Sequence, residues 1–264
     1  MLIVKVGGGD AISKLAVTED IKTLGGDVVF VHGGRRQADQ VARELGSPTK
    51  RIVSPSGLTS VLTDKAVLDI LTMVYAGLVN KQWVSAFQSV GLNAIGLSGA
   101  DGRLWLGVRK QHIIAVENGK QKLVSGTYTG KVLEVNSKLV KTLLDNSYVP
   151  VITQPAVTSD GTLINTDNDR TVAVMAKALG VKKIVVLFEA PGFLKDVSDP
   201  LSVVSRIKRG ELMDMMRYAE GSMKKKVLGA IEAFSQGVET IYWGDGRIDH
   251  PVREALAGKG TVIQ

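Results

Sequence analysis

Hydrophobic positions along the chain follow two alternating patterns. Short continuous apolar runs predict strands buried on both faces, and apolar residues three or four positions apart predict helices. The predicted strands are Leu2–Val6, Val28–Val31, Ala94–Leu97, Tyr148–Ile152, Lys183–Leu187 and Glu239–Trp243. The predicted helices are Ala11–Leu24, Arg36–Leu45, Asp64–Val90, Ser137–Asn146, Asp167–Leu179 and Met223–Gln236. Glycines at 46, 91 and 180 stand where such helices would end.

Strands that alternate with helices indicate a mainly parallel sheet with helices on both faces. Two stretches interrupt the alternation. Residues 103–132 read as short strands with a hairpin turn at Glu117-Asn118-Gly119-Lys120, which predicts a β-hairpin flap. Residues 190–218 read as a polar loop with short helices. We therefore expect an α/β fold, a three-layer α/β/α sandwich with a mainly parallel central sheet. It would form a single domain over residues 1–264, with two lobes, about 1–179 and about 180–264.

Composition places the chain among ordinary globular proteins. Of its 264 residues 44% are hydrophobic and 22% charged, and it has no cysteine, which excludes disulfides and thiolate metal sites. The sequence shows neither a signal peptide nor a long apolar stretch that could span a membrane. These features predict a cytoplasmic protein with no membrane association.

The net charge of +7 suggests an anionic partner. Nucleic acid would be the simplest candidate, but aromatic residues make up only 5% and no arginine-rich tail is present. We therefore expect no nucleic-acid binding. An acidic partner protein and anionic metabolites stay open.

Two glycine turns follow the first two predicted strands. Lys5 stands near the end of the first strand, before Gly7-Gly8-Gly9, and His32-Gly33-Gly34 closes the second. Glycine lets backbone N–H groups approach an anion closely, a following helix N-terminus adds positive potential, and lysine adds a full charge. The alternative is a solvent-exposed edge lysine before an ordinary turn. The pattern is neither a Walker A loop nor a complete G-x-G-x-x-G, because Ile12 occupies the last place.

Histidines offer little chemistry in this sequence. The three histidines, His32, His112 and His250, are not spaced as metal ligands, and no metal-binding residues are predicted. We expect His32 to be structural.

Two polar clusters precede later helices. Asn165-Thr166-Asp167-Asn168-Asp169 could be an N-cap cluster, but it has more polar residues than one cap needs. Lys224, Lys225 and Lys226 stand at a helix start, where positive charge opposes the helix dipole. They could form a solvated patch, or one of them could turn inward toward a phosphate.

In order and spacing these four motifs resemble the amino acid kinase family over the whole chain. Within that family the chain is most similar to carrier-protein-dependent aminoadipate kinases, the LysZ type, which are related to the N-acetylglutamate kinases. The finer similarity lies in the stretches Met73–Lys81, Asn93–Leu104, Tyr128–Gly130, Ile164–Asp167 and Met223–Ala230.

The resemblance implies an ATP-dependent kinase with Mg²⁺. It would phosphorylate the side-chain carboxylate of 2-aminoadipate, or of glutamate, to an acyl phosphate in lysine or arginine biosynthesis. The amino group of that substrate would be linked to a small acidic carrier protein of the LysW type. The resemblance also implies a homodimer, a substrate-binding lobe over residues 1–179 and a nucleotide-binding lobe over residues 180–264.

The resemblance assigns roles by position. Lys5 and Lys226 would be catalytic and Asp169 would orient them. Substrate would contact Gly33, Gly34, Asn165 and the position of Val61, with the N–H groups of Gly8, Gly9, Gly33 and Gly34 holding phosphate and carboxylate. Nucleotide would contact Gly7, Gly8, Gly9, Phe188, Gly192, Phe193 and Met223.

One position departs from the family pattern. Related kinases usually place an arginine where this chain has Val61, three residues before Asp64, to hold the substrate's α-carboxylate. Valine cannot pair with a carboxylate. Either Arg35, Arg36 or Arg51 replaces that arginine, or the substrate differs.

Other functions stay open at this point. They are an N-acetylglutamate kinase, a non-catalytic homologue that binds a nucleotide or a partner, and, more distantly, a Rossmann-type dehydrogenase, for which the glycine fingerprint is incomplete.

Overall fold

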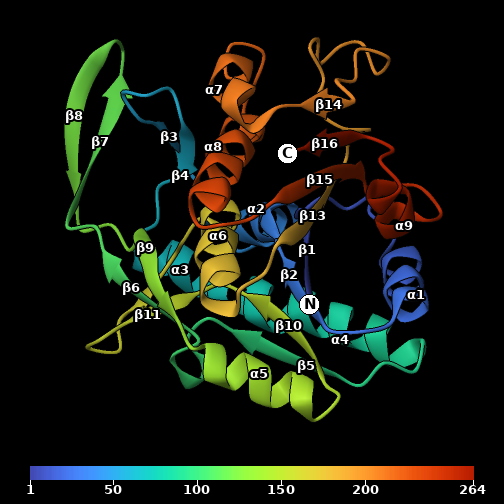
Figure 1. The fold of residues 1–264 in the computed structure, drawn as a ribbon. Coiled ribbons are helices and arrows are strands. Elements are labelled where there is room, and N and C mark those ends of the chain that lie inside the picture. Colours follow the sequence, from blue (N-terminus) through green and yellow to red (C-terminus); the bar gives the residue numbers. More distant parts are fainter.

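A mainly parallel sheet of eight strands forms the centre of the protein (Figure 1). The structure, a computed structural model, describes all residues 1–264. The strand order is β14-β16-β15-β13-β1-β2-β10-β5, and only the pair β15–β16 is antiparallel. The bounds are β1 Leu2–Val6, β2 Val28–His32, β5 Ala94–Ser98, β10 Val149–Thr153, β13 Lys183–Phe188, β14 Arg206–Ile207, β15 Thr240–Asp245 and β16 Thr261–Ile263. All six predicted strands are thus confirmed.

Helices cover both faces of this sheet, as the three-layer prediction requires. One apolar core holds residues from α1 (Lys14–Leu24), α2 (Arg35–Glu44), α3 (Lys65–Thr72), α4 (Asn80–Ser89) and α9 (Pro251–Leu256). The other holds residues from α5 (Ser137–Asp145), α6 (Asn168–Leu179), α7 (Leu212–Met215) and α8 (Ser222–Ser235). A π-helical segment, Met73–Val79, joins α3 to α4, so the long helix predicted there changes its hydrogen bonding midway.

Alternation along β1 decides where Lys5 points. Ile3 belongs to the core under α6 and α8, whereas Val4 and Val6 belong to the opposite core. Because successive side chains of a strand point to opposite faces, Lys5 emerges on the same side as Ile3. That side carries α6 and α8, which bear the other two predicted catalytic residues.

Smaller sheets lie at the periphery. They are the hairpin β3 (Arg51–Val53)–β4 (Thr59–Val61), the hairpin β7 (His112–Glu117)–β8 (Lys120–Ser125), and a sheet of order β12-β11-β6-β9. The last contains β6 Trp105–Arg109, β9 Gly130–Val135, β11 Ala156–Thr158 and β12 Leu163–Ile164. The predicted hairpin turn forms with φ of 49° at Asn118 and 75° at Gly119. That β7–β8 acts as a flap stays a prediction.

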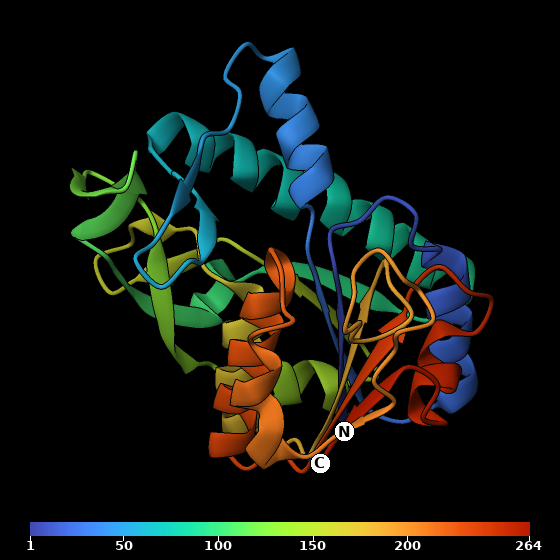
Figure 2. The same cartoon turned by 90° about the horizontal axis from the view of Figure 1, so that it is seen from above.

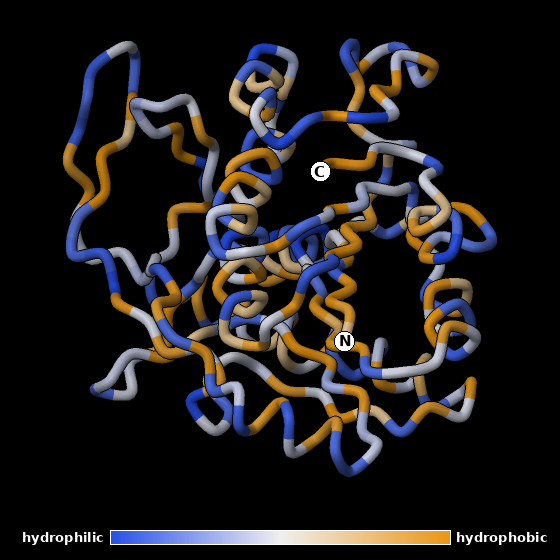
Figure 3. Tube along the Cα trace, in the orientation of Figure 1, coloured by the Kyte–Doolittle hydropathy of each residue, from blue (hydrophilic) through white to orange (hydrophobic).

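Both hairpins lie on one side of the molecule and α1 and α9 on the other (Figure 2). Hydrophobic residues concentrate along the central strands, whereas many outer turns are hydrophilic (Figure 3). No helix combines the length and the apolar character needed to cross a membrane. Every strand after Leu179 lies on one side of β1, and β2, β10 and β5 lie on the other.

Candidate active site

Two glycine turns interlock at the carboxyl ends of β1 and β2. The strands are paired in register, Val6 beside His32, so the turns that follow them meet. A Cβ atom on Gly8 would lie 2.5 Å from the backbone nitrogen of Arg35, and one on Gly33 would lie 2.9 Å from that of Gly8. No side chain fits at either position without moving the backbone.

Some backbone N–H groups of these turns are hydrogen-bonded within the protein, and others are not. Gly7 N–H donates to the carbonyl of Leu187 and Gly33 N–H to that of Val6, both at 2.9 Å. The Gly33 N–H is therefore already used by the sheet, and a substrate contact at Gly33 stays a prediction. The N–H groups of Gly8 and Gly9 donate to no acceptor in the protein, which leaves them for an anion. The N–H of Gly34 instead donates to the hydroxyl of Tyr75.

Lys5 and Asp169 form a buried ion pair above these turns. Lys5 Nζ lies 2.6 Å from Asp169 Oδ1, and the two side chains are 6% and 15% exposed. Burial alone would raise the pKa of Asp169, but the charges of Lys5 and Lys226 outweigh it and hold the pKa below its usual range. Asp169 is thus an anion between two lysines.

Lys226 is the second buried lysine of the site. It is 8% exposed, and its Nζ lies 5.3 Å from the centre of the Phe188 ring. Burial lowers its pKa to about 8, with the Asp169 carboxylate opposing this shift and the charge of Lys5 adding to it. A new anion beside Lys226 would therefore stabilise its charged form.

A close helix contact brings Lys226 and Asp169 together. One turn after Lys226, Gly229 faces α6 so closely that a Cβ atom there would lie 2.8 Å from the carbonyl oxygen of Asp169. The missing side chain lets α8 approach the first turn of α6.

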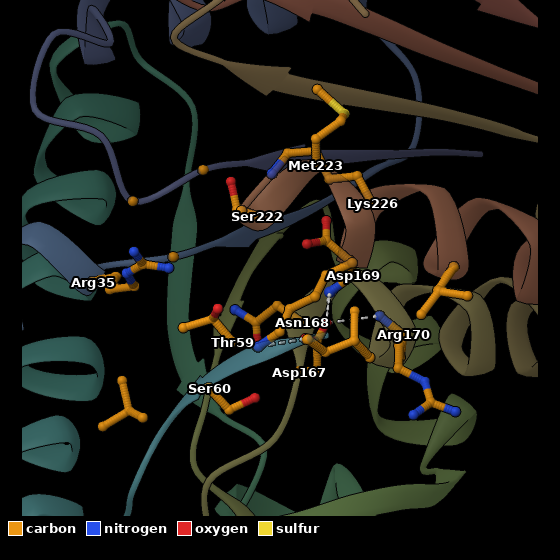
Figure 4. Close-up of a pocket in the computed structure, with 18 of the residues that line it drawn as sticks. Arg35, Thr59, Ser60, Asp167, Asn168, Asp169, Arg170, Ser222, Met223 and Lys226 are labelled. Atoms are coloured by element: carbon orange, nitrogen blue, oxygen red, sulfur yellow. Dashed lines mark hydrogen bonds and ion pairs between the residues drawn. The ribbon is translucent and has the colours of Figure 1, made fainter. Parts of the chain in front are cut away.

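Polar residues at the start of α6 fix its position (Figure 4). The Asp167 side chain caps the helix by accepting from the N–H groups of Asp169 and Arg170, and its other oxygen lies 3.4 Å from Lys225 Nζ. Asn168 Nδ2 donates to the carbonyl of His32 at 2.9 Å. The helix is thus tied to the glycine turn after β2.

His32 is structural, as expected. It is fully buried; its Nδ1 donates to the Gly33 carbonyl and its Nε2 accepts from Asn80, each at 3.0 Å. Burial lowers its pKa to about 4, so it is neutral at physiological pH.

One large cavity, of about 980 Å³, unites most of the predicted site residues. Its lining includes Lys5, Gly7, Gly8, Gly9, Gly33, Val61, Asn165, Asp169, Phe188, Gly192, Met223 and Lys226. Gly34 and Phe193 are not part of this lining. Phe193 is fully buried and stacks on Trp243 with ring centres 6.0 Å apart, so its side chain belongs to the core rather than to a nucleotide site.

Three of the four predicted substrate residues, Gly33, Val61 and Asn165, line this cavity. Asn165 Nδ2 donates to Thr63 Oγ1 at 2.8 Å, which joins the segment before α6 to the segment before α3. Val61 ends β4, directly opposite Arg51 in the β3–β4 register.

Glu189 lines the cavity but was not singled out from the sequence. It follows β13, accepts from the N–H of Ala11 at 2.8 Å and pairs with Arg36 at 2.8 Å. A Cβ atom on Gly9 would lie 2.2 Å from its carboxyl carbon, so this side chain packs directly on the glycine turn. Its place one residue beyond a predicted buried strand was the available signal, because ligands bind beyond the carboxyl ends of parallel strands.

The arrangement is suited to stabilising concentrated negative charge. Two buried ammonium groups, oriented by one carboxylate, face free backbone amides in a shared cavity. The protein offers no group of three or more His, Cys, Asp or Glu side chains that could hold a metal ion. Such a site favours transfer of an already charged group by positioning and charge neutralisation.

Comparisons with known proteins support the same interpretation of the site. The chain is 44% identical to the [LysW]-aminoadipate kinase of Thermus thermophilus and 43% identical to that of Deinococcus radiodurans. The first match covers all of both chains, and the second covers all of this chain and 91% of the relative. Among solved structures, N-acetylglutamate synthase from Neisseria gonorrhoeae superposes with a TM-score of 0.79 at 20% identity, covering 99% of this chain and 58% of that one. The sequence profile of the amino acid kinase family matches residues 1–242. The chain therefore belongs to the amino acid kinase family.

Proposed function

We propose that this protein transfers the γ-phosphoryl group of ATP to the side-chain carboxylate of carrier-linked 2-aminoadipate or glutamate. The carrier would be a small acidic protein of the LysW type, and the product an acyl phosphate used in lysine or arginine biosynthesis. The observation that carries this proposal is the Lys5–Asp169–Lys226 group beside the free glycine amides. The names of the full-length relatives supply the substrate class.

The proposed chemistry needs no general base. The attacking carboxylate is already ionised at neutral pH, so the protein has only to align it with the γ-phosphorus and neutralise charge. Lys5 and Lys226 would stabilise the oxygens of the moving phosphoryl group. The N–H groups of Gly8 and Gly9 would hold it in place.

The nucleotide would lie on the side of the cavity formed by the segment after β13 and the start of α8. Phe188, Gly192 and Met223 line that side. Mg²⁺ usually keeps several waters and binds through phosphates with one or two carboxylates. We therefore propose that it arrives with ATP and neutralises the charge of the β- and γ-phosphates.

Three further proposals follow from the family resemblance. Residues 1–179 would bind the substrate and residues 180–264 the nucleotide. The protein would act as a homodimer, and it would work in the cytoplasm. The basic net charge of +7 supports an acidic carrier as its partner.

A coupled acyl-phosphate assay tests the function. The purified protein with Mg-ATP is given carrier-linked 2-aminoadipate, carrier-linked glutamate or free N-acetylglutamate, and the product is trapped with hydroxylamine. We expect turnover on the carrier-linked substrates. Turnover on free N-acetylglutamate alone would contradict the proposal and favour an N-acetylglutamate kinase. No turnover with ATP binding intact would favour a non-catalytic homologue.

A further inference from the structure

Four arginines line the cavity, and three of them have a close carboxylate partner. Arg36 pairs with Glu189 at 2.8 Å, Arg51 pairs with Asp39 at 2.6 Å, and Arg170 makes a two-nitrogen contact with Glu232. Arg35 is different, because its nearest carboxylate oxygen, on Asp39, lies 3.9 Å away. Its guanidinium has the capacity to take another anion.

The fold holds Arg35 at the centre of the site. It is the first residue of α2, and its backbone nitrogen packs against Gly8. Its side chain is 50% exposed and extends from α2 toward the middle of the cavity, on the side opposite Arg170 (Figure 4). A positive side chain in the first turn opposes the helix dipole, and this turn contains no acidic residue to compensate. A bound anion would remove that unfavourable interaction.

The wall nearest Arg35 belongs to the substrate side of the cavity. Asp39 lies between Arg35 and Arg51. One of its carboxylate oxygens accepts from Thr49 at 2.7 Å, which holds the carboxylate in place, and the other accepts from the Arg51 guanidinium at 2.6 Å. Arg51 in turn lies opposite Val61, an aliphatic residue that offers nothing to a carboxylate. On this wall, Arg35 is therefore the guanidinium with the longer contact to a carboxylate, 3.9 Å against 2.6 Å for Arg51.

We propose that Arg35 binds the second carboxylate of the substrate, the α-carboxylate of the carrier-linked amino acid. This inference rests on the proposed function, in which the side-chain carboxylate is the phosphoryl acceptor and the amino group is masked by the carrier. The α-carboxylate is then the remaining charge of the amino acid. A planar guanidinium matches a carboxylate with two parallel hydrogen bonds.

Arg35 is close enough to Lys226 for its charge to help lower the pKa of that lysine, but the two side chains have different partners. Lys5 and Lys226 already face the place of the transferring phosphoryl group, beside Asp169. The Arg35 guanidinium instead lies nearest to Asp39, which also pairs with Arg51 of the β3–β4 hairpin. Its role is therefore substrate recognition, which acts on binding rather than on the chemical step.

The test uses two carrier substrates that differ in one group. The carrier is loaded either with 2-aminoadipate or with 5-aminopentanoate, which lacks only the α-carboxylate. We expect Arg35→Ala to raise KM for the aminoadipate carrier by about 10- to 100-fold while kcat changes little. We expect the same variant to leave KM for the aminopentanoate carrier unchanged. Arg35→Lys should recover part of the loss, because it keeps the charge without the planar fork.

Arg43→Ala is the matched control. Arg43 lies in the last turn of the same helix, is exposed and does not line the cavity, so its removal changes the net charge equally without touching the site. We expect its KM values to equal those of the unmodified protein.

Three outcomes would overturn the assignment. The first is an Arg35→Ala protein that still prefers the aminoadipate carrier as strongly as before. The second is a loss confined to kcat, which would place Arg35 at the phosphoryl group. The third is a Val61→Arg protein with KM lowered by more than about tenfold, which would reveal a vacant carboxylate site. Failure of the unmodified protein to phosphorylate the aminoadipate carrier would instead refute the proposed function, so the two failures are distinguishable.

Discussion

At the scale of single residues, the site depends on holding two like charges close together. Lys5 and Lys226 are both buried, and their mutual repulsion is offset by the one carboxylate of Asp169. One acid cannot fully balance two bases, so these three side chains together carry excess positive charge in a poorly solvated place. An incoming phosphoryl group relieves that imbalance, and this is the physical reason for expecting tight charge stabilisation there.

Removing either lysine should therefore affect chemistry more than folding. We expect Lys5→Ala and Lys226→Ala each to lower kcat by about 10²- to 10³-fold, the usual effect of losing one preorganised charged donor. Single-turnover kinetics on the carrier-linked substrate measure this loss. Circular dichroism should show an unchanged fold. Lys224→Ala, on the same helix but outside the cavity lining, is the control, and near-normal turnover by a lysine variant would remove that residue from the catalytic group.

The lowered pKa of Lys226 predicts a pH dependence. Because burial brings that pKa to about 8, the side chain is charged below pH 8 and becomes neutral above it. We expect kcat/KM, which reports the free enzyme, to fall as the pH rises through about 8. In Lys226→Arg the guanidinium stays charged, so the residual activity should lose this alkaline decline. An identical decline in both proteins would assign it to another group.

At the scale of helices and turns, glycines determine how closely the elements approach. Gly8 and Gly33 let two turns interlock, and Gly229 lets α8 contact α6. We expect Gly229→Ala to lower the free energy of unfolding by about 1–3 kcal/mol, because the added methyl group overpacks the contact with Asp169. It should also reduce kcat by moving Lys226 away from Asp169. Chemical denaturation and steady-state kinetics measure the two effects.

Gly77→Ala provides the comparison for that substitution. Gly77 is exposed in the π-helical segment, and a Cβ atom there meets nothing within 4 Å. The same chemical change should therefore be neutral or stabilising, by up to about 1 kcal/mol. Equal destabilisation by both variants would contradict the packing argument.

The sequence predicted the elements well because each has a strong local signal. The buried strands Leu2–Val6 and Lys183–Phe188 are continuous apolar runs, and Gly180 ends α6 in the left-handed conformation expected of it. The separate roles of the glycine amides could not be predicted, because they depend on which strand pairs beside each turn. The direction of the Phe193 side chain could not be predicted for a similar reason. An aromatic residue after a strand can face the cavity or the core, and its packing on Trp243 decides between them. Gly229 carries no local signal, since its importance arises from its contact with Asp169, a residue far away in the sequence.

At the scale of the whole molecule, β1 is the boundary between the two proposed lobes. Because strands from each lobe flank it, the nucleotide and the carrier-linked substrate should each protect a different set of backbone amides from hydrogen exchange. We expect a non-hydrolysable ATP analogue with Mg²⁺ to slow amide hydrogen exchange over residues 188–194 and 221–226. Carrier-linked 2-aminoadipate should slow it over the β3–β4 hairpin and Asn165. Mass spectrometry resolves the two sets.

Overlapping footprints would contradict the division near Leu179. If the nucleotide analogue alone protected the β3–β4 hairpin, that hairpin would belong to the nucleotide side. The Lys226→Ala protein can serve for the substrate experiment, because its slower turnover reduces conversion when ATP and the carrier are present together.

Strand direction has a practical consequence for handling the protein. Leu2 pairs with Val28 at the first residue of β2, and Ile263 pairs with Ile241 near the start of β15, because β16 runs antiparallel to it. Both ends of the chain therefore leave the sheet at the edge opposite the cavity. If the protein is immobilised on a surface through a flexible tether at either terminus, the cavity will face the solution. A protein-sized substrate can then reach it.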